Sequence, residues 1–133
     1  MTEQDHIDAM LAKLRERTQG GGEMIIGIIS PYSGDVQRNT AFLRDIIRSI
    51  LAEGHTPIAG HALYPQVLDD TDPEQRAQGM AAGQHLLTAC CEVRVYDQLG
   101  MSDGMRADLE FCGANNVPFK FARLDGWDCG GRR

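Results

Sequence analysis

The residues best suited to chemistry in this sequence stand in the segment 102–110, which reads SDGMRADLE. Asp108 and Glu110 supply carboxylates, and Gly104 lies in a turn between an expected strand and an expected helix. A helix start leaves backbone N–H groups without partners, and these groups attract an anion. An anion cradle beside a carboxylate suits a phosphorylated sugar whose anomeric carbon needs stabilising. A capped helix with acidic residues in its first turn explains the same letters, and spacing alone favours that plainer interpretation.

Polar residues also follow the other apolar runs of the chain. In the loop 30–35, Tyr32 could stack on a base or hold a sugar hydroxyl, and Gly34 could let the backbone approach a ligand closely. His61 follows a second run, and Asp97 follows a third, where it could protonate a leaving base. From spacing alone, a plain turn is the favoured interpretation of the first loop, and a surface histidine is the more common outcome for His61. The first loop matches neither the dinucleotide-binding pattern nor the Walker A pattern.

Several charged residues offer further contacts to an anionic or polar ligand. Arg38, Arg44 and Arg106 are candidate phosphate partners, although a solvated helix face accounts for all three and is favoured for Arg44. Asp69, Asp70 and Asp72 could be ligands, but Asp72 precedes a proline and fits a helix cap at least as well.

The elements that must position these loops alternate between strand and helix. Apolar runs predict strands over 24–29, 56–60, 92–96 and 117–122. Apolar spacing and capping residues predict helices over 36–53, 73 to about 90, and 107–115. The first of these helices has an expected core face of Phe42, Leu43, Ile46, Ile47, Ile50 and Leu51. This order predicts an α/β fold, a Rossmann-like parallel sheet of four to five strands with helices on both faces, with the ligand at the carboxyl ends of the strands.

The chain divides into three parts by its patterning. Residues 1–22 form an appended helix at 3–17, whose apolar stripe includes Ile7 and Leu11, followed by a Gly-rich joint. Residues 23–123 form the main domain, and residues 124–133 form a Gly-rich, polar tail that we expect to fray. The stripe on the appended helix predicts a homodimer or a larger oligomer.

Composition narrows the class of partner. Among the 133 residues the net charge is −6, which argues against binding a nucleic-acid backbone. No apolar run reaches the roughly 20 residues of a membrane helix, and no secretory signal is visible, so we expect a cytoplasmic protein that avoids membranes. The four cysteines form no CxxC pair, and we expect neither a metal nor a cofactor.

Three segments taken together resemble a known family. They read ISPYSGD at 29–35, PIAGHALYPQ at 57–66 and SDGMRAD at 102–108. In this order they resemble the nucleoside 2-deoxyribosyltransferase-like family, specifically its small DUF4406 and DUF7768 type members of bacteria and phages. The resemblance spans about residues 24–123 and implies a Rossmann-like sheet and chemistry at an N-glycosidic bond, with no cofactor.

The resemblance also implies roles for single residues. Relatives carry a glutamate four residues after the motif glycine, as nucleophile on the sugar C1′ or as stabiliser of an oxocarbenium ion; this chain has Asp108 there. Transferases usually carry aspartate where this chain has Ser102, whereas the related deoxynucleoside 5′-monophosphate N-glycosidases carry a serine that contacts the phosphate. Ser102 therefore implies a nucleoside monophosphate as ligand.

We accordingly expect a nucleotide N-glycosidase or deoxyribosyltransferase-like enzyme, with Asp108 and Asp97 as catalytic residues. The expected substrate contacts are Ser30, Tyr32, Ser33, Gly34, His61, Ser102, Gly104 and Met105. The alternative is a nucleotide-binding module without turnover, such as a sensor or a sequestering protein, because aspartate replaces glutamate at 108. A structural or interaction protein is a third possibility, based on the appended helix.

Overall fold

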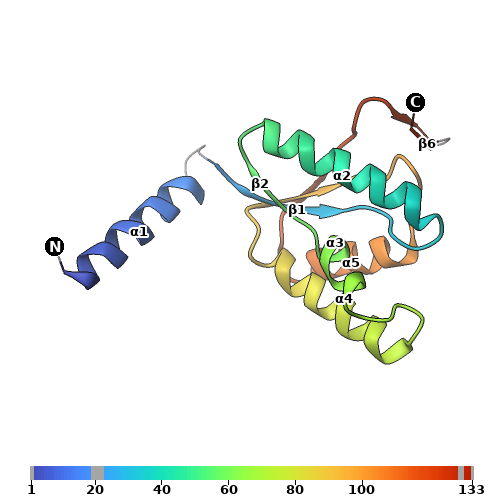
Figure 1. Cartoon of the computed structure of the whole chain (residues 1–133), viewed down its shortest axis with the longest axis horizontal. Coiled ribbons are helices and arrows are strands. Elements are labelled where there is room, and N and C mark those ends of the chain that lie inside the picture. The colour runs from blue at the N-terminus through green and yellow to red at the C-terminus, as the bar shows by residue number, and fades with distance from the viewer. Residues whose placement is uncertain (1, 19–22, 129–130, 133) are drawn as a thin grey trace.

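Four parallel strands form the sheet at the centre of the main body. The computed structural model describes residues 2–18, 23–128 and 131–132, without the side chains at 13–18, 128 and 131–132. The strands lie in the order β2-β1-β3-β4, and their bounds are β1 Ile25–Ile29, β2 Thr56–Ile58, β3 Glu92–Val95 and β4 Phe119–Phe121. Every neighbouring pair is parallel. Helices cover both faces (Figure 1), so the predicted α/β, Rossmann-like fold is confirmed.

The strand order creates a switch point at β1. This strand pairs with β2 on one side and with β3 on the other, so the connections from it run in two directions. Loops that follow β1 and β3 therefore diverge and leave space beyond the carboxyl ends of the strands. Ligands in open parallel sheets bind at such places.

Helix α2 (Val36–Ala52) covers one face of the sheet. Asp35 caps it by accepting a hydrogen bond from Arg38 N at 3.1 Å. Its apolar stripe packs Phe42, Ile46 and Ile50 against the sheet, all completely buried. The expected core role of Leu51 is wrong, because its side chain is 57% exposed at the last turn.

Four helical segments lie on the other face (Figure 1): α3 Gly60–Leu63, the 3-10 turn η1 Tyr64–Gln66, α4 Pro73–Leu87 and α5 Asp103–Ala114. The expected loop at 61–65 is therefore helical, and β2 ends two residues earlier than expected. Helix α4 ends at Leu87, before the expected 90. Helix α5 begins four residues earlier than expected, because the Ser102 hydroxyl caps it by accepting from Met105 N at 3.2 Å.

Two glycines let α3 lie directly on α4. A Cβ atom placed on Gly60 would lie 2.8 Å from the Cα of Gly83, closer than any side chain tolerates. The two backbones can therefore approach this closely only because residue 60 lacks a side chain, whereas a Cβ atom on Gly83 would make an ordinary contact at 3.9 Å. This contact fixes α3, and with it His61, above the carboxyl end of the sheet.

The segment after residue 123 corrects the expectation of a fraying tail. Trp127 is buried on Phe42, with ring centroids 5.1 Å apart, and Leu124 packs against the same core. The buried Gln98 amide donates to the carbonyls of Leu124 and Trp127, at 2.8 and 2.6 Å. Residues 127–128 (β5) and 131–132 (β6) form an antiparallel pair. Residues 129, 130 and 133 lie outside the described part.

The appended helix is confirmed as α1 (Glu3–Thr18), and it stands clear of the sheet in Figure 1. Ile7, Met10 and Leu11 are exposed along it. The predicted Gly-rich joint at 19–22 lies outside the described residues, and the predicted oligomer stays a prediction. In the part of the chain that the structure describes, no helix combines the length and the apolar character needed to cross a membrane.

Candidate functional site

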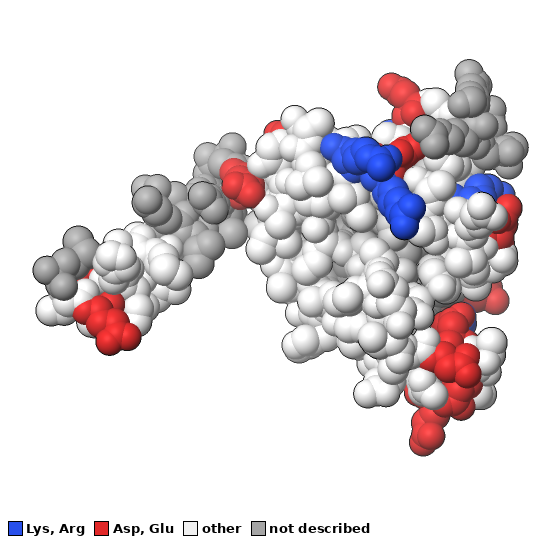
Figure 2. Space-filling view, viewed as in Figure 1, with Lys and Arg blue, Asp and Glu red and all other residues white. Residues whose placement is uncertain are grey.

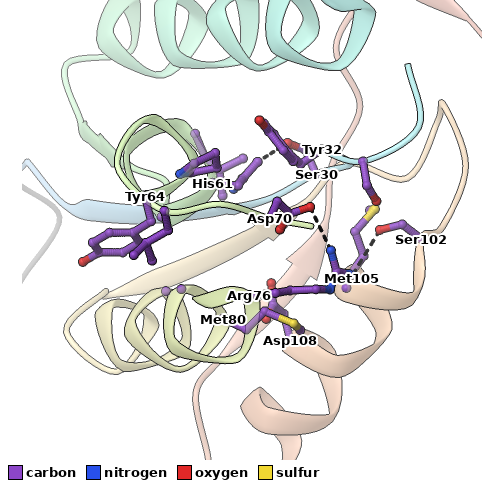
Figure 3. Close-up of a pocket in the computed structure, with 18 of the residues that line it drawn as sticks. Ser30, Tyr32, His61, Tyr64, Asp70, Arg76, Met80, Ser102, Met105 and Asp108 are labelled. Carbon is purple, nitrogen blue, oxygen red and sulfur yellow. Dashed lines mark hydrogen bonds and ion pairs between the residues drawn. The ribbon is translucent and has the colours of Figure 1, made fainter. Parts of the chain in front are cut away.

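A pocket opens between the loops that follow β1, β2 and β3, on the face covered by α3, α4 and α5 (Figure 3). The empty space between its walls is about 860 Å³, the part open to solvent included. Seven of the eight expected substrate contacts line it, namely Ser30, Tyr32, Ser33, His61, Ser102, Gly104 and Met105, together with Asp108.

One edge of the pocket carries a serine–histidine pair. Ser30 Oγ and His61 Nε2 lie 2.7 Å apart, and Ser30 is buried directly after β1. Burial lowers the pKa of His61 to about 4. The imidazole is therefore neutral at pH 7 and only weakly basic, so its part in the pocket is to hydrogen-bond and orient neighbouring groups.

The side chain of Asn39, in α2, holds the loop 30–35 in place. This side chain is 1% exposed, and its amide donates to the carbonyls of Tyr32 and Ser33, at 3.0 and 3.1 Å. Arg38 in turn donates to Asn39 Oδ1 at 3.0 Å, which keeps the amide oriented. Two backbone carbonyls and a buried amide thus fix the position from which Tyr32 enters the pocket.

Gly34 is the expected contact that does not line the pocket. It is exposed in the turn before α2, with φ at +95°. Its carbonyl accepts from Val36 N at 3.0 Å. Gly34 therefore serves the turn into the helix, where a positive φ favours glycine, and its role is not close approach to a ligand.

The start of α5 forms the opposite wall. Ser102, Gly104 and Met105 line the pocket together with Asp108, which lies one turn further along the helix. The first N–H groups of a helix have no carbonyl one turn before them, so this wall favours negative charge. Asp108 thus lies on the same wall as the start of α5, and anion binding at this wall stays a prediction.

Asp108 is half-buried in the pocket wall. Gln84 of α4 donates its amide N–H to Asp108 Oδ1 at 3.2 Å. Burial raises the pKa of this carboxyl group, and the hydrogen bond from Gln84 opposes the rise by favouring the ionised form. A carboxylate in these surroundings is poorly solvated, so it interacts strongly with any positive charge that develops near it.

Sequence comparison adds the family to this geometry. The family model described as "Domain of unknown function (DUF7768)" matches residues 24–122. The chain belongs to this family. A search of curated proteins found no match. The DUF7768 match covers the whole sheet, α2 to α5 and every residue that lines the pocket.

Asp97 does not lie in the pocket of this DUF7768 domain, contrary to expectation. The chain leaves the sheet after Tyr96, and Asp97 becomes exposed at the start of a turn in which its carbonyl accepts from Gly100 N at 2.9 Å. Arg106 is likewise exposed and pairs with Asp103 at 3.1 Å. Neither side chain lines the pocket.

Sequence reasoning missed the wall that η1 and α4 supply. Tyr64 and Met80 contribute apolar surface, and Arg76 and Asp70 form an ion pair at 2.9 Å (Figure 3). Asp70 is among the ligands that the sequence suggests, whereas Arg76 is not. The signal available was the pair of glycines at 79 and 83, whose small size is what a helix needs beside a cavity.

The described residues also bear on metal binding. Among them, no three His, Cys, Asp or Glu side chains converge on one point where a cation could sit. Cys90 and Cys112 are buried free thiols, and burial raises the pKa of both. Both thiols are therefore poorly reactive at neutral pH. Their role is to pack in the core beside β1 and β3.

Proposed function

We propose that the pocket binds a nucleoside 5′-monophosphate and that Asp108 acts on its N-glycosidic bond, as in an N-glycosidase or a deoxyribosyltransferase-like enzyme. The observation that carries this proposal is the half-buried Asp108 carboxylate, which shares one pocket with Tyr32, His61 and Ser102. The likeness of the three sequence motifs to nucleoside 2-deoxyribosyltransferases supports the same ligand.

The walls of the pocket suit the three parts of a nucleotide. Tyr64, Met80 and Tyr32 offer apolar and aromatic surface to a base. The start of α5 offers N–H groups and the Ser102 hydroxyl to a phosphate. Asp108 then faces the sugar between them, where positive charge develops as the bond to the base breaks.

The proposed reaction breaks the C1′–N bond, and its electron pair leaves on the base, which takes a proton from water. Ionised Asp108 stabilises the oxocarbenium-like sugar or adds to C1′ directly. Water then supplies the oxygen that ends on C1′ in hydrolysis, and a second base supplies nitrogen in transfer. The neutral His61, bonded to Ser30, orients the sugar or the attacking water.

A binding module without turnover is the second candidate. Aspartate is shorter than the glutamate of the relatives by one methylene, about 1.5 Å of reach. A misplacement of that size costs on the order of 100-fold in rate. The bond from Gln84 also holds one oxygen of Asp108 toward α4. Both features suit a pocket that recognises a nucleotide and leaves it intact.

One screen separates the two candidates. The wild-type protein is mixed with the four ribonucleoside and the four 2′-deoxynucleoside 5′-monophosphates, each beside its nucleoside, and thermal shift and free base are measured. We expect a thermal shift with base release. A shift without release supports the binding module, and the absence of both signals with every compound overturns both candidates.

Variants at 108 then test the assignment of the carboxylate. Asp108→Asn should lose base release by about 100-fold or more and keep nucleotide affinity within a few-fold. Asp108→Glu should keep or raise activity if the pocket has room for a methylene. Glu110→Gln is the matched control, because Glu110 is exposed on the same helix and lies outside the pocket. Full activity of Asp108→Ala would refute the assignment.

A further inference from the structure

The ion pair between Asp70 and Arg76 has no part in the reaction proposed above, although both side chains line the pocket. Arg76 Nη1 donates to Asp70 Oδ2 at 2.9 Å, and each side chain is 38% exposed. Arg76 lies in the first turns of α4, and Asp70 lies in the segment before it. A pair that solvent reaches to this extent adds little to stability.

The segment before α4 is held in place by other bonds. Asp69 N donates to Gln75 Oε1 at 2.8 Å, and Thr71 donates from both its N–H and its hydroxyl to Asp69 Oδ1. Asp72 caps α4 by accepting from Gln75 N at 3.4 Å. The ion pair is therefore not needed to fasten this segment, and its place in the pocket wall calls for another explanation.

The charges around the pocket single out Arg76. Of the described residues that line the pocket, Arg76 is the one lysine or arginine, while Asp70 and Asp108 are carboxylates. Figure 2 shows acidic side chains gathered where the chain enters α4, a region that includes the exposed Asp69 and Glu74. A phosphate that enters through this acidic surface needs a cation to offset it.

Arg76 also lies where a phosphate would be held. In Figure 3 its guanidinium end extends from α4 to the side of the pocket where α5 begins, near Ser102 and Met105. A guanidinium presents several N–H donors in a fixed plane and binds phosphate through two of them. Together with the start of α5 it would enclose a phosphate from two sides.

We propose that Arg76 is the phosphate-binding residue of this pocket and that Asp70 competes with the phosphate for it. The inference rests on the proposed function, because it assumes a nucleotide ligand. Binding exchanges one anionic partner of Arg76 for another. In the free protein, Asp70 keeps the guanidinium of Arg76 oriented. A ligand without a phosphate cannot displace Asp70 from Arg76, so the pocket favours ligands that carry one.

Titration calorimetry with the best nucleotide of the screen and its nucleoside tests this inference. Arg76→Gln should weaken binding of the nucleotide by roughly 10- to 100-fold and should change nucleoside binding by less than about 3-fold. Arg76→Lys keeps the charge and loses the planar fork, so its nucleotide affinity should fall between those of the wild type and Arg76→Gln.

A matched pair of carboxylate variants isolates the competition. Asp70→Asn and Asp69→Asn each remove one negative charge from the same segment, but only Asp70 holds Arg76. Asp70→Asn should tighten nucleotide binding by about 3- to 10-fold, and Asp69→Asn by no more than about 2-fold. Equal gains in the two variants would overturn the competition. If Arg76→Gln does not fold, this pair decides alone.

The outcomes also distinguish this inference from the proposed function. Nucleotide binding that Arg76→Gln leaves unchanged overturns the role of Arg76 and leaves the proposed function standing. An equal loss of nucleotide and nucleoside affinity shows that Arg76 only shapes the pocket, and it overturns the phosphate contact. A wild-type protein that binds neither compound overturns both proposals.

Discussion

The two faces of the sheet are closed by different kinds of side chain. On one face α2 sets Phe42, Ile46 and Ile50 against the strands, and Trp127 completes the layer from the end of the chain. On the other face a second core that includes Leu87, Val93 and Val95 covers part of the sheet. Beside it, Gly79 of α4 faces Tyr64 and Leu68, and Gly83 faces the backbone of α3 at Gly60. The first face is a sealed core and the second face contains the pocket.

This difference shows where the fold gives up packing to make room for a ligand. Large aliphatic and aromatic residues fill space to high density and stabilise the protein. Glycines in α4 have no side chain to bury. They also lower the stability of the helix by about 1 kcal/mol for each position relative to alanine. The pocket face should therefore tolerate substitution better in stability than in ligand binding, and the α2 face should show the reverse.

Truncation of one residue on each face is the strongest way to break this comparison. Phe42→Ala removes a completely buried ring that contacts Tyr96 and Trp127, and it should lower the free energy of unfolding by about 3–5 kcal/mol. Met80→Ala in the pocket wall should cost about 1 kcal/mol or less, because its side chain already borders empty space. Urea denaturation measures both, and equal losses would contradict the difference between the faces.

The pH dependence of stability tests the pocket face through His61, which lies at the edge of the pocket. His61 has a lowered pKa of about 4 in the folded protein, against an ordinary value near 6.5, so the unfolded chain binds more protons between these limits. The contribution of His61 is complete above pH 6.5, and roughly 2–3 kcal/mol of it should be lost as the pH falls to 4. Denaturation at several pH values measures this slope.

His61→Gln should flatten that slope, since glutamine does not titrate. His85→Gln serves as the matched control, because His85 lies in the last turn of α4 with its side chain in solvent. A slope that survives His61→Gln and disappears in His85→Gln would assign the acid sensitivity to the exposed His85 and contradict the role given to His61.

The smallest expected effect on stability is at Asp108, and its pH dependence has the opposite sign to that of His61. Burial raises the pKa of Asp108, which means that ionisation of this carboxyl group destabilises the folded protein as the pH rises through its folded pKa. Asp108→Asn should therefore raise stability at pH 7 by less than about 1 kcal/mol and change little below pH 4. Thermal melts at the two pH values measure it. A loss of stability at pH 7 would mean that the carboxylate itself holds α4 to α5 through Gln84.

The fold was predictable where the sequence carries its own pattern. Apolar β-branched runs identified the strands to within one or two residues at most ends, because burial on both faces leaves no polar positions in β1. The apolar stripe of α2 predicted the closed core in the same way. Leu51 failed because the stripe continues past the point where the helix still faces the sheet.

The pocket was predictable only in part. The loops after β1, β2 and β3 follow from the strand order, and they account for Tyr32, His61 and Ser102. Arg76 was missed because α4 lacks a clear apolar stripe that would indicate which of its side chains face the pocket. Asp97 was wrongly expected in the pocket, because the chain turns at 97–100 and leaves its side chain exposed.

Trp127 gives the protein an internal reporter. It is the one tryptophan in the sequence, and its indole N–H donates to Asp45 Oδ2 at 3.0 Å while its ring lies on Phe42. Its fluorescence therefore comes from the face opposite the pocket, where no nucleotide would quench it. Selective excitation of this indole can therefore follow the unfolding of the α2 face separately from ligand binding in the pocket.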